Sequence, residues 1–194
     1  MGIGPTALRL YEHLLSERHF RSGMSVCELG SQDFVPKKYG NWINRISDKG
    51  ARGFYEHLGM VPYVCIDTNG ERDALRLDLN TVTWTGDQFD VVTNHGTSEH
   101  IFNQWNCFRV INDLTKPGGL MIHIVPCKGY PRHGFFRYDS LFFEELAREN
   151  KYKMLCCYEE NDRVGTLIVV VMRKLNDILF ATPMQTTYGV AVPA

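Results

Sequence analysis

Two apolar segments with a helix between them constrain the fold of this chain most strongly. The run Phe89-Asp90-Val91-Val92-Thr93-Asn94 is rich in the β-branched and aromatic residues of a buried strand. A second such run, residues 119–125, begins in the turn sequence Lys116-Pro117-Gly118-Gly119. Between them, residues 103–114 carry apolar side chains at steps of three, as on one face of a helix. This order predicts a strand–helix–strand unit of a parallel sheet.

The same alternation extends over most of the chain. The pattern predicts helices over residues 5–20, 51–58, 103–114 and 140–150, and strands over residues 24–29, 62–67, 74–79, 89–94, 119–125, 154–159 and 166–172. Residues 32–52 contain Pro36, Gly40 and Gly50 and are expected to be partly irregular. We therefore expect an α/β fold with a mostly parallel, seven-stranded sheet that has an antiparallel strand near its C-terminal end.

Composition favours one globular domain without a membrane or nucleic-acid partner. We expect residues 1–174 to form the domain, with a helix in residues 1–22 packing on it, and residues 175–194 to form a C-terminal tail. The formal net charge is -1 and the basic residues are scattered, which argues against nucleic acid. No run reaches the roughly 20 apolar residues of a membrane helix, so a cytoplasmic protein is expected.

Cysteine spacing excludes the common zinc motifs. The chain has six cysteines, and none of them form a pair separated by two residues. Most lie in apolar runs, so we expect reduced thiols in the core of the protein. No bound metal is expected.

Acidic residues follow three of the predicted strands. Glu28 comes at the end of the first strand and is followed by Gly30, which lets the backbone pass close to a ligand. Asp67 ends the second strand, where a carboxylate can accept hydrogen bonds from both hydroxyls of a ribose. Asp78 ends the third, next to Leu79, a pair suited to the amino edge and face of an adenine. Ligands of open α/β sheets bind beyond these strand ends.

With these residues in place, the chain resembles the class I S-adenosylmethionine-dependent methyltransferases, in particular their small-molecule branch. Glu28-Leu29-Gly30 resembles the first motif of that family, Phe89-Asp90-Val91-Val92 its fourth strand, and Lys116-Pro117-Gly118-Gly119 the turn before its fifth strand. The resemblance covers residues 24–174 and implies a Rossmann-like three-layer sandwich that binds S-adenosylmethionine. The cofactor-binding residues that it implies are Glu28, Gly30, Ser31, Asp67, Thr68, Asp78, Leu79 and Asn94.

The chain departs from the family pattern in its first loop and in its spacing. Gln32 and Phe34 stand where the family usually has a second and a third glycine. The spacing from Glu28 to Asp67 is longer than the family norm, whereas Asp67 and Asp78 are too close for the helix normally found between them. Asp78 is therefore a weaker assignment than Asp67.

The expected reaction is methyl transfer to oxygen of a small or sugar-like acceptor. Removal of a hydroxyl proton suits a histidine at neutral pH. His100 and His133 are the predicted bases, with His95 as a further candidate, while His123 alternates with apolar neighbours and is expected to be structural. Arg132 and Arg137 could hold a carboxylate or phosphate of the acceptor.

Two alternatives remain open. The altered glycine loop also fits a non-catalytic member of the fold that acts as a binding or interaction subunit. A nicotinamide-dependent enzyme fits less well, because the Gly-x-Gly-x-x-Gly fingerprint is absent. A small-molecule substrate is the expected partner, and a homo-oligomer is compatible with the sequence. Trp105 and Phe108 are expected to belong to the core rather than to a substrate pocket.

Overall fold

The computed structural model describes residues 2–34 and 50–183. In chain order the elements are β1 (Gly2–Ile3), α1 (Pro5–Ser16), β2 (Val26–Leu29), β3 (Asp33–Phe34), α2 (Ala51–His57), β4 (Tyr63–Ile66), the 3₁₀ turn η1 (Glu71–Asp73), β5 (Phe89–His95), the 3₁₀ turn η2 (Ser98–His100), α3 (Gln104–Leu114), β6 (Thr115–Gly129), α4 (Ser140–Glu149), β7 (Lys153–Asn161) and β8 (Gly165–Arg173). The strands and helices alternate as expected from the sequence.

The main sheet has six strands in the order β4-β2-β5-β6-β8-β7. Pairs β2–β4, β2–β5 and β5–β6 are parallel, and β8 lies antiparallel to both β6 and β7. β1 and β3 form a separate parallel pair. The mixed, Rossmann-like sheet with an antiparallel strand near the C-terminal end is therefore confirmed.

Residues 74–79, one of the seven strands expected from the sequence, do not form a strand of the sheet, so this prediction is wrong. This segment contributes only an isolated bridge between Leu75 and Ile66. Arg72 and Asp73 before it have φ angles of 52° and 60°, outside the extended region that a strand requires. After it, Asp78 accepts the backbone N–H of Asn80 at 2.9 Å, which begins a turn. Turn chemistry at both ends thus leaves too few residues for a strand.

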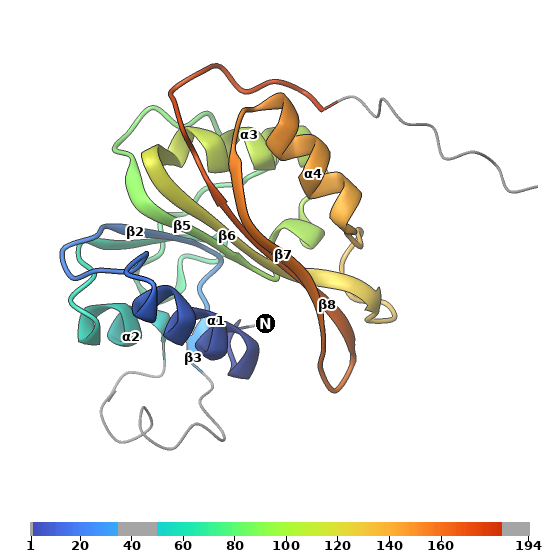
Figure 1. Cartoon of the computed structure of the whole chain (residues 1–194), viewed down its shortest axis with the longest axis horizontal. Helices are drawn as coiled ribbons and strands as arrows, with labels where there is room; N and C mark the ends of the chain where they lie inside the picture. The colour runs from blue at the N-terminus through green and yellow to red at the C-terminus, as the bar shows by residue number, and fades with distance from the viewer. Residues whose placement is uncertain (1, 35–49, 184–194) are drawn as a thin grey trace, which may run out of the picture.

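Helices cover both faces of the sheet, which gives the three layers that the resemblance implies. Figure 1 shows α1 and α2 on one face and α3 and α4 on the other. The strands supply alternate residues to the two faces: Val26 packs in the core under α1 and α2, whereas Cys27 packs in the core under α3 and α4. Both faces of β2 are consequently buried, as is typical of a parallel sheet.

Helices α1, α3 and α4 begin where the sequence offers a start signal. Pro5 occupies the first turn of α1, and the side chains of Asn103 and Asp139 accept backbone N–H groups at the starts of α3 and α4. Helix α1 ends at Ser16, earlier than the expected residue 20, because Arg18 takes a φ of 58°. These boundaries place the loops of the sheet without changing its topology.

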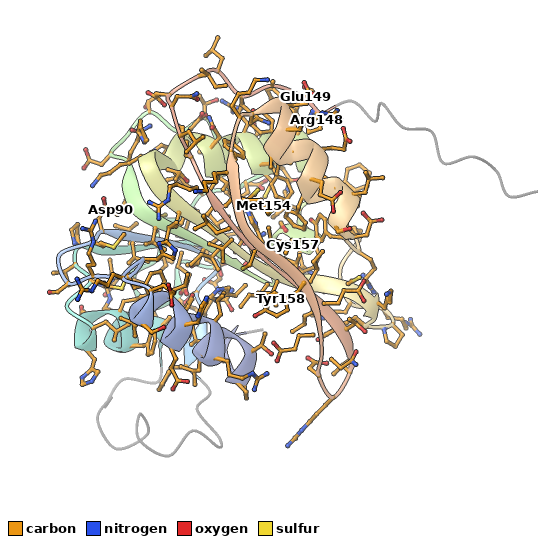
Figure 2. All side chains as sticks on the ribbon, in the orientation of Figure 1. Asp90, Arg148, Glu149, Met154, Cys157 and Tyr158 are labelled. Atoms are coloured by element: carbon orange, nitrogen blue, oxygen red, sulfur yellow. The ribbon has the colours of Figure 1, made fainter. Side chains whose placement is uncertain are left out.

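The two motifs that identify the fold are joined by an ion pair. Lys116 Nζ lies 2.9 Å from Asp90 Oδ2, which also accepts Ser25 N–H at 2.8 Å and the Ser25 hydroxyl at 2.7 Å. Burial raises the pKa of Asp90, but these hydrogen bonds outweigh burial and hold it below its usual value. Figure 2 shows Asp90 where β5 begins, at the edge of the sheet away from the strand ends that bind ligands.

The C-terminal segment doubles back over the helices. Residues 175–183 are described, and Ala181 and Asn150 exchange two hydrogen bonds, of 2.7 and 3.0 Å. The remainder of the expected tail, and most of the segment expected to be irregular, lie outside the described residues. None of the helices in residues 2–34 and 50–183 has the length and apolarity to cross a bilayer.

Candidate functional site

A cavity of about 310 Å³ opens at the carboxyl ends of β2, β4 and β5. Its size lies at the lower end of the range for small-molecule sites, roughly 300–1,000 Å³. Its walls are Gly30, Ser31, Gln32, Ile66, Asp67, Thr68, Leu77, Leu79, Gly96, Thr97, His100 and Ile101. Five of the residues expected to bind the cofactor, Gly30, Ser31, Asp67, Thr68 and Leu79, are therefore brought together here, with His100 beside them.

Asp67 is held in place by the loop that follows β2. Its Oδ2 accepts the backbone N–H of Ser31 at 2.8 Å, and its Oδ1 accepts that of Asn69 at 3.1 Å. The side chain is only partly buried, so its remaining lone pairs face the cavity. The arrangement orients a carboxylate toward a polar ligand.

Gly30 is required by this geometry. Its φ of +83° lies in the left-handed region, and a Cβ there would stand 2.5 Å from Gln32 Nε2 and 2.6 Å from Thr97 Oγ1. Gln32 Nε2 donates to Leu29 O at 3.2 Å and to Thr97 Oγ1 at 3.1 Å. Gln32, which stands in place of the family's second glycine, thus fixes the loop after β2 to the turn after β5 through these two hydrogen bonds.

Gln32 also offers an atom that sequence reasoning missed. The residue is 5% exposed, yet its buried Oε1 has no hydrogen-bond partner within residues 2–34 and 50–183. A buried, unsatisfied carbonyl oxygen costs about 1–3 kcal/mol. A ligand in the cavity that donates a hydrogen bond, such as an ammonium group, would satisfy this oxygen after a turn of the Gln32 side chain that exposes it to the cavity. The departure from the family glycine was visible in the sequence, but the direction of the side chain was not.

Three expected cofactor residues do not line the cavity. Glu28 is fully buried, accepts the Tyr63 hydroxyl at 2.7 Å, and has its pKa raised by burial to about 8. The Asn94 side chain contacts Ser98 Oγ at 2.8 Å and so organises the turn after β5. Asp78 uses its Oδ1 to cap the turn at residue 80. Their assignments to the cofactor stay predictions, and their observed contacts are structural.

A second cavity, of about 650 Å³, lies between the start of α1, the turn between β7 and β8, and the end of β5. His95 lines this cavity, whereas Gly96, the next residue, lines the first. His95 Nε2 bonds the Tyr11 hydroxyl at 3.0 Å, and Tyr11 bonds Tyr55 at 2.8 Å. Burial lowers the pKa of His95 to about 3, so the imidazole is neutral, and its Nδ1 has no partner in the part of the chain that the structure describes.

The two predicted bases lie together on one carboxylate. His133 Nε2 is 3.3 Å from Glu99 Oε1, and His100 Nε2 is 3.8 Å from the same atom. The rings of the two histidines stand edge to face, with centroids 4.8 Å apart. Glu99 is fully buried, and burial raises its pKa to about 7. Sequence reasoning selected both histidines but missed Glu99, which resembles an ordinary residue of a helix start.

The loop that carries His133 is fixed by backbone contacts. The N–H groups of Phe135 and Phe136 donate to Glu99 O at 2.7 and 3.2 Å. Arg137 donates to Gly129 O at 3.2 Å and to Phe136 O at 2.9 Å, and it also contacts Tyr130 O. The guanidinium expected to hold an acidic acceptor therefore ties its own loop together.

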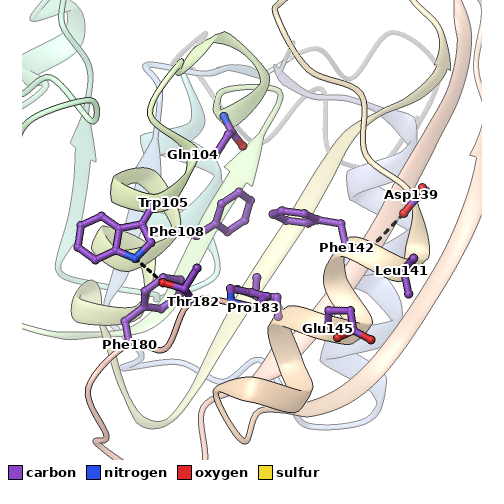
Figure 3. Close-up of a pocket in the computed structure, with 11 residues that line it drawn as sticks. Gln104, Trp105, Phe108, Asp139, Leu141, Phe142, Glu145, Phe180, Thr182 and Pro183 are labelled. Carbon is purple, nitrogen blue, oxygen red and sulfur yellow. Dashed lines mark hydrogen bonds between the residues drawn. The ribbon is translucent and has the colours of Figure 1, made fainter. Parts of the chain in front are cut away.

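A third cavity, of about 410 Å³, lies between α3 and α4. Figure 3 shows Phe108 and Phe142 inside it, with Phe180 and Thr182 of the C-terminal segment along its rim. Trp105 is 48% exposed and donates Nε1–H to Thr182 Oγ1 at 3.0 Å, so its expected place in the core is wrong. Phe108 is buried as expected. Mostly apolar walls make this cavity a poor match for a charged cofactor.

Comparison with solved structures places the chain in a known fold. The 1,6-didemethyltoxoflavin-N1-methyltransferase of Burkholderia thailandensis, solved with S-adenosylhomocysteine, superposes with a TM-score of 0.59 at 13% identity over 87% of this chain and 78% of that chain. The N-methyltransferase NodS of Bradyrhizobium japonicum gives 0.58 at 12% identity, over 87% and 94%. The [4+2]-cyclase SpnF gives 0.59 at 11% identity, over 87% and 81%.

These similarities show that the chain has the fold of the class I S-adenosylmethionine-dependent methyltransferases. No protein-family model matches the sequence, and no curated protein matches it. Because SpnF shares the architecture and is described as a cyclase, the fold by itself does not define the reaction. The function must be argued from the site.

Proposed function

We propose that the protein is a methyltransferase that uses S-adenosylmethionine bound in the cavity at the ends of β2, β4 and β5. The observation that carries the proposal is the convergence of Gly30, Ser31 and Asp67 on one cavity wall, with the Asp67 carboxylate fixed by two backbone N–H groups. Asp67 would accept the ribose hydroxyls, and Leu79 would contact the adenine. Gln32 Oε1 would accept a hydrogen bond from the ammonium group in the methionine part of the cofactor.

The acceptor would occupy the larger cavity that His95 lines. Consecutive residues, His95 and Gly96, line the two cavities, so the methyl donor and the acceptor would meet at the end of β5. The sulfonium supplies an electrophilic methyl, and the protein aligns the acceptor and excludes water. A cavity of this size suits a small or sugar-like molecule, and oxygen is the proposed acceptor atom.

Binding of S-adenosylhomocysteine, the product form of the cofactor, tests this proposal. At about 100 times its dissociation constant the ligand should stabilise the protein by roughly 2.7 kcal/mol. For a domain of this size that is a rise of about 5–10 °C in Tm. The absence of any rise at millimolar ligand would contradict the proposal.

Variants of Asp67 separate specific binding from a general effect. Asp67→Asn keeps a side-chain oxygen but loses the charge, and it should weaken binding by at least about tenfold, since hydrogen bonds to charged groups contribute about 1.5–3 kcal/mol each. Asp87→Ala removes an exposed carboxylate elsewhere and serves as the control. Binding without turnover on any acceptor would favour the alternative of a non-catalytic binding protein.

A further inference from the structure

The three side chains beside the cofactor cavity form a set of metal ligands. One atom each from Glu99, His100 and His133 can be chosen so that all three lie within 4.8 Å of one another. Two ligands of a tetrahedral zinc ion, each about 2.0–2.2 Å from it, stand about 3.4 Å apart. The Nε2–Oε1 distance of 3.3 Å from His133 to Glu99 already matches. The distance of 3.8 Å from His100 and the separation of the two histidines, within 4.8 Å, would shorten by rotation of the half-exposed His100 ring.

From this geometry we propose that Glu99, His100 and His133 bind one divalent cation of the zinc class. Two imidazoles and one carboxylate are a donor set typical of catalytic zinc and of related first-row ions, whereas calcium and magnesium prefer oxygen ligands alone. Three protein ligands leave coordination positions open for water or a substrate oxygen. The side chains of His100 and His133 are 47% and 34% exposed, which gives the cation a path from solvent.

A second observation, independent of the ligand distances, concerns Glu99. Its side chain is 0% exposed, and its Oε2 is buried without a hydrogen-bond partner among the described residues. A buried carboxylate is stable when it is paired or coordinates a metal. A cation held by both oxygens of the Glu99 carboxylate would supply the interaction that Oε2 lacks.

The surrounding chain holds the ligands in position. The backbone of Glu99 accepts two N–H groups from the loop that carries His133. Gly134 makes this approach possible, because a Cβ at that position would stand 2.8 Å from Glu99 Cγ. The two segments are far apart in sequence, so their close contact is a property of the fold. Such support is what a precise metal site requires.

The role of the cation rests on the proposed function. His100 also lines the cofactor cavity, whereas none of the three ligands lines the cavity proposed for the acceptor. The cation would therefore lie beside the bound cofactor and fix the position of His100 and of the loop that carries His133. The two histidines then act as metal ligands and not as bases.

Calorimetric titration of the full-length protein with ZnCl₂, after removal of metal with EDTA and dialysis, tests the site. We expect one equivalent of Zn²⁺ to bind to the wild-type protein. Glu99→Gln and His133→Ala should each weaken binding by more than about a hundredfold, the upper range for residues that merely support metal ligands. His13→Ala, which removes an exposed histidine on α1, should bind as the wild type does.

Absorption spectra of the protein with bound Co²⁺ test whether the metal ion binds instead through partly buried thiols, those of Cys127, Cys156 and Cys157. Co²⁺ bound at Glu99, His100 and His133 should show no thiolate-to-metal charge-transfer band. A strong band of this kind, no binding at millimolar Zn²⁺, or equal binding by the wild type and both variants would each overturn the proposal. Tm in EDTA checks that the variants are folded.

The outcome is separable from that of the proposed function. Binding of S-adenosylhomocysteine is measured in EDTA, without a divalent cation. If S-adenosylhomocysteine binds and Zn²⁺ does not, the metal site alone is refuted. If Zn²⁺ binds and S-adenosylhomocysteine does not, the metal site stands, but its place beside a bound cofactor is refuted.

Discussion

Replacing Glu28 by glutamine should remove a pH-dependent loss of stability. Glu28 is fully buried, and burial raises its pKa from 4.5 to about 8. Below pH 4.5 the carboxyl is protonated in both the folded and the unfolded chain, so it has no effect on the pH dependence. Between pH 4.5 and 8 the unfolded chain releases a proton that the folded protein keeps, and stability therefore falls as the pH rises.

The magnitude follows from the pKa difference. Each pH unit in this window corresponds to about 1.4 kcal/mol, so the loss from Glu28 reaches about 3 kcal/mol at pH 7 and levels off near pH 8 at about 5 kcal/mol. Glutamine keeps the shape and can still accept the Tyr63 hydroxyl. Its new amide N–H₂ lacks an acceptor, but that cost does not vary with pH.

Urea denaturation at pH 5, 6, 7 and 8 measures the effect. The free energy of unfolding of Glu28→Gln minus that of the wild type should grow by about 1.4 kcal/mol for each pH unit. Glu144→Gln, at an exposed position on α4, is the matched control and should track the wild type. A difference between Glu28→Gln and the wild type that stays constant from pH 5 to 8 would refute the reasoning.

Two further substitutions test the cofactor loop and the fold-defining ion pair. Gly30→Ala should abolish binding of S-adenosylhomocysteine measured by calorimetry, because a Cβ at φ +83° displaces Gln32 and Thr97; binding equal to wild type would show that the loop is not a close-fitting wall. Asp90→Ala should lower the free energy of unfolding by about 1–3 kcal/mol, since it leaves Ser25 and Lys116 without their acceptor, while cofactor affinity stays unchanged. Urea denaturation checks the second, and a change below about 0.5 kcal/mol would contradict it.

Much of the fold could be predicted because its strands are short apolar runs punctuated by strong turn signals. The strands at residues 89–94 and 119–125 were recognisable from composition, and their pairing followed from the helix between them. The strand predicted at residues 74–79 does not form, because Arg72 and Asp73 directly before it adopt the left-handed backbone conformation. Local composition does not reveal such a conformation at residues other than glycine.

The site was harder to predict than the fold, because it depends on side-chain direction. Asp67 and Gly30 are placed by the strand ends themselves, and the structure brings them together at the cavity. Glu28 also lies at the end of a strand, yet its side chain points away from the cavity and accepts a hydrogen bond from the Tyr63 hydroxyl. The contact of Glu99 with His133 joins two loops that are distant in sequence, and no local pattern encodes it.

A crystal structure of the protein grown with S-adenosylhomocysteine tests the central claim most directly. The account predicts that the ligand fills the cavity at the ends of β2, β4 and β5, with both ribose hydroxyls on the Asp67 carboxylate and the ammonium group on Gln32 Oε1. Its sulfur should point toward the end of β5, between His95 and Gly96. A ligand bound in the apolar cavity beside Trp105, or a cofactor cavity left without ligand at saturating concentration, would contradict the account.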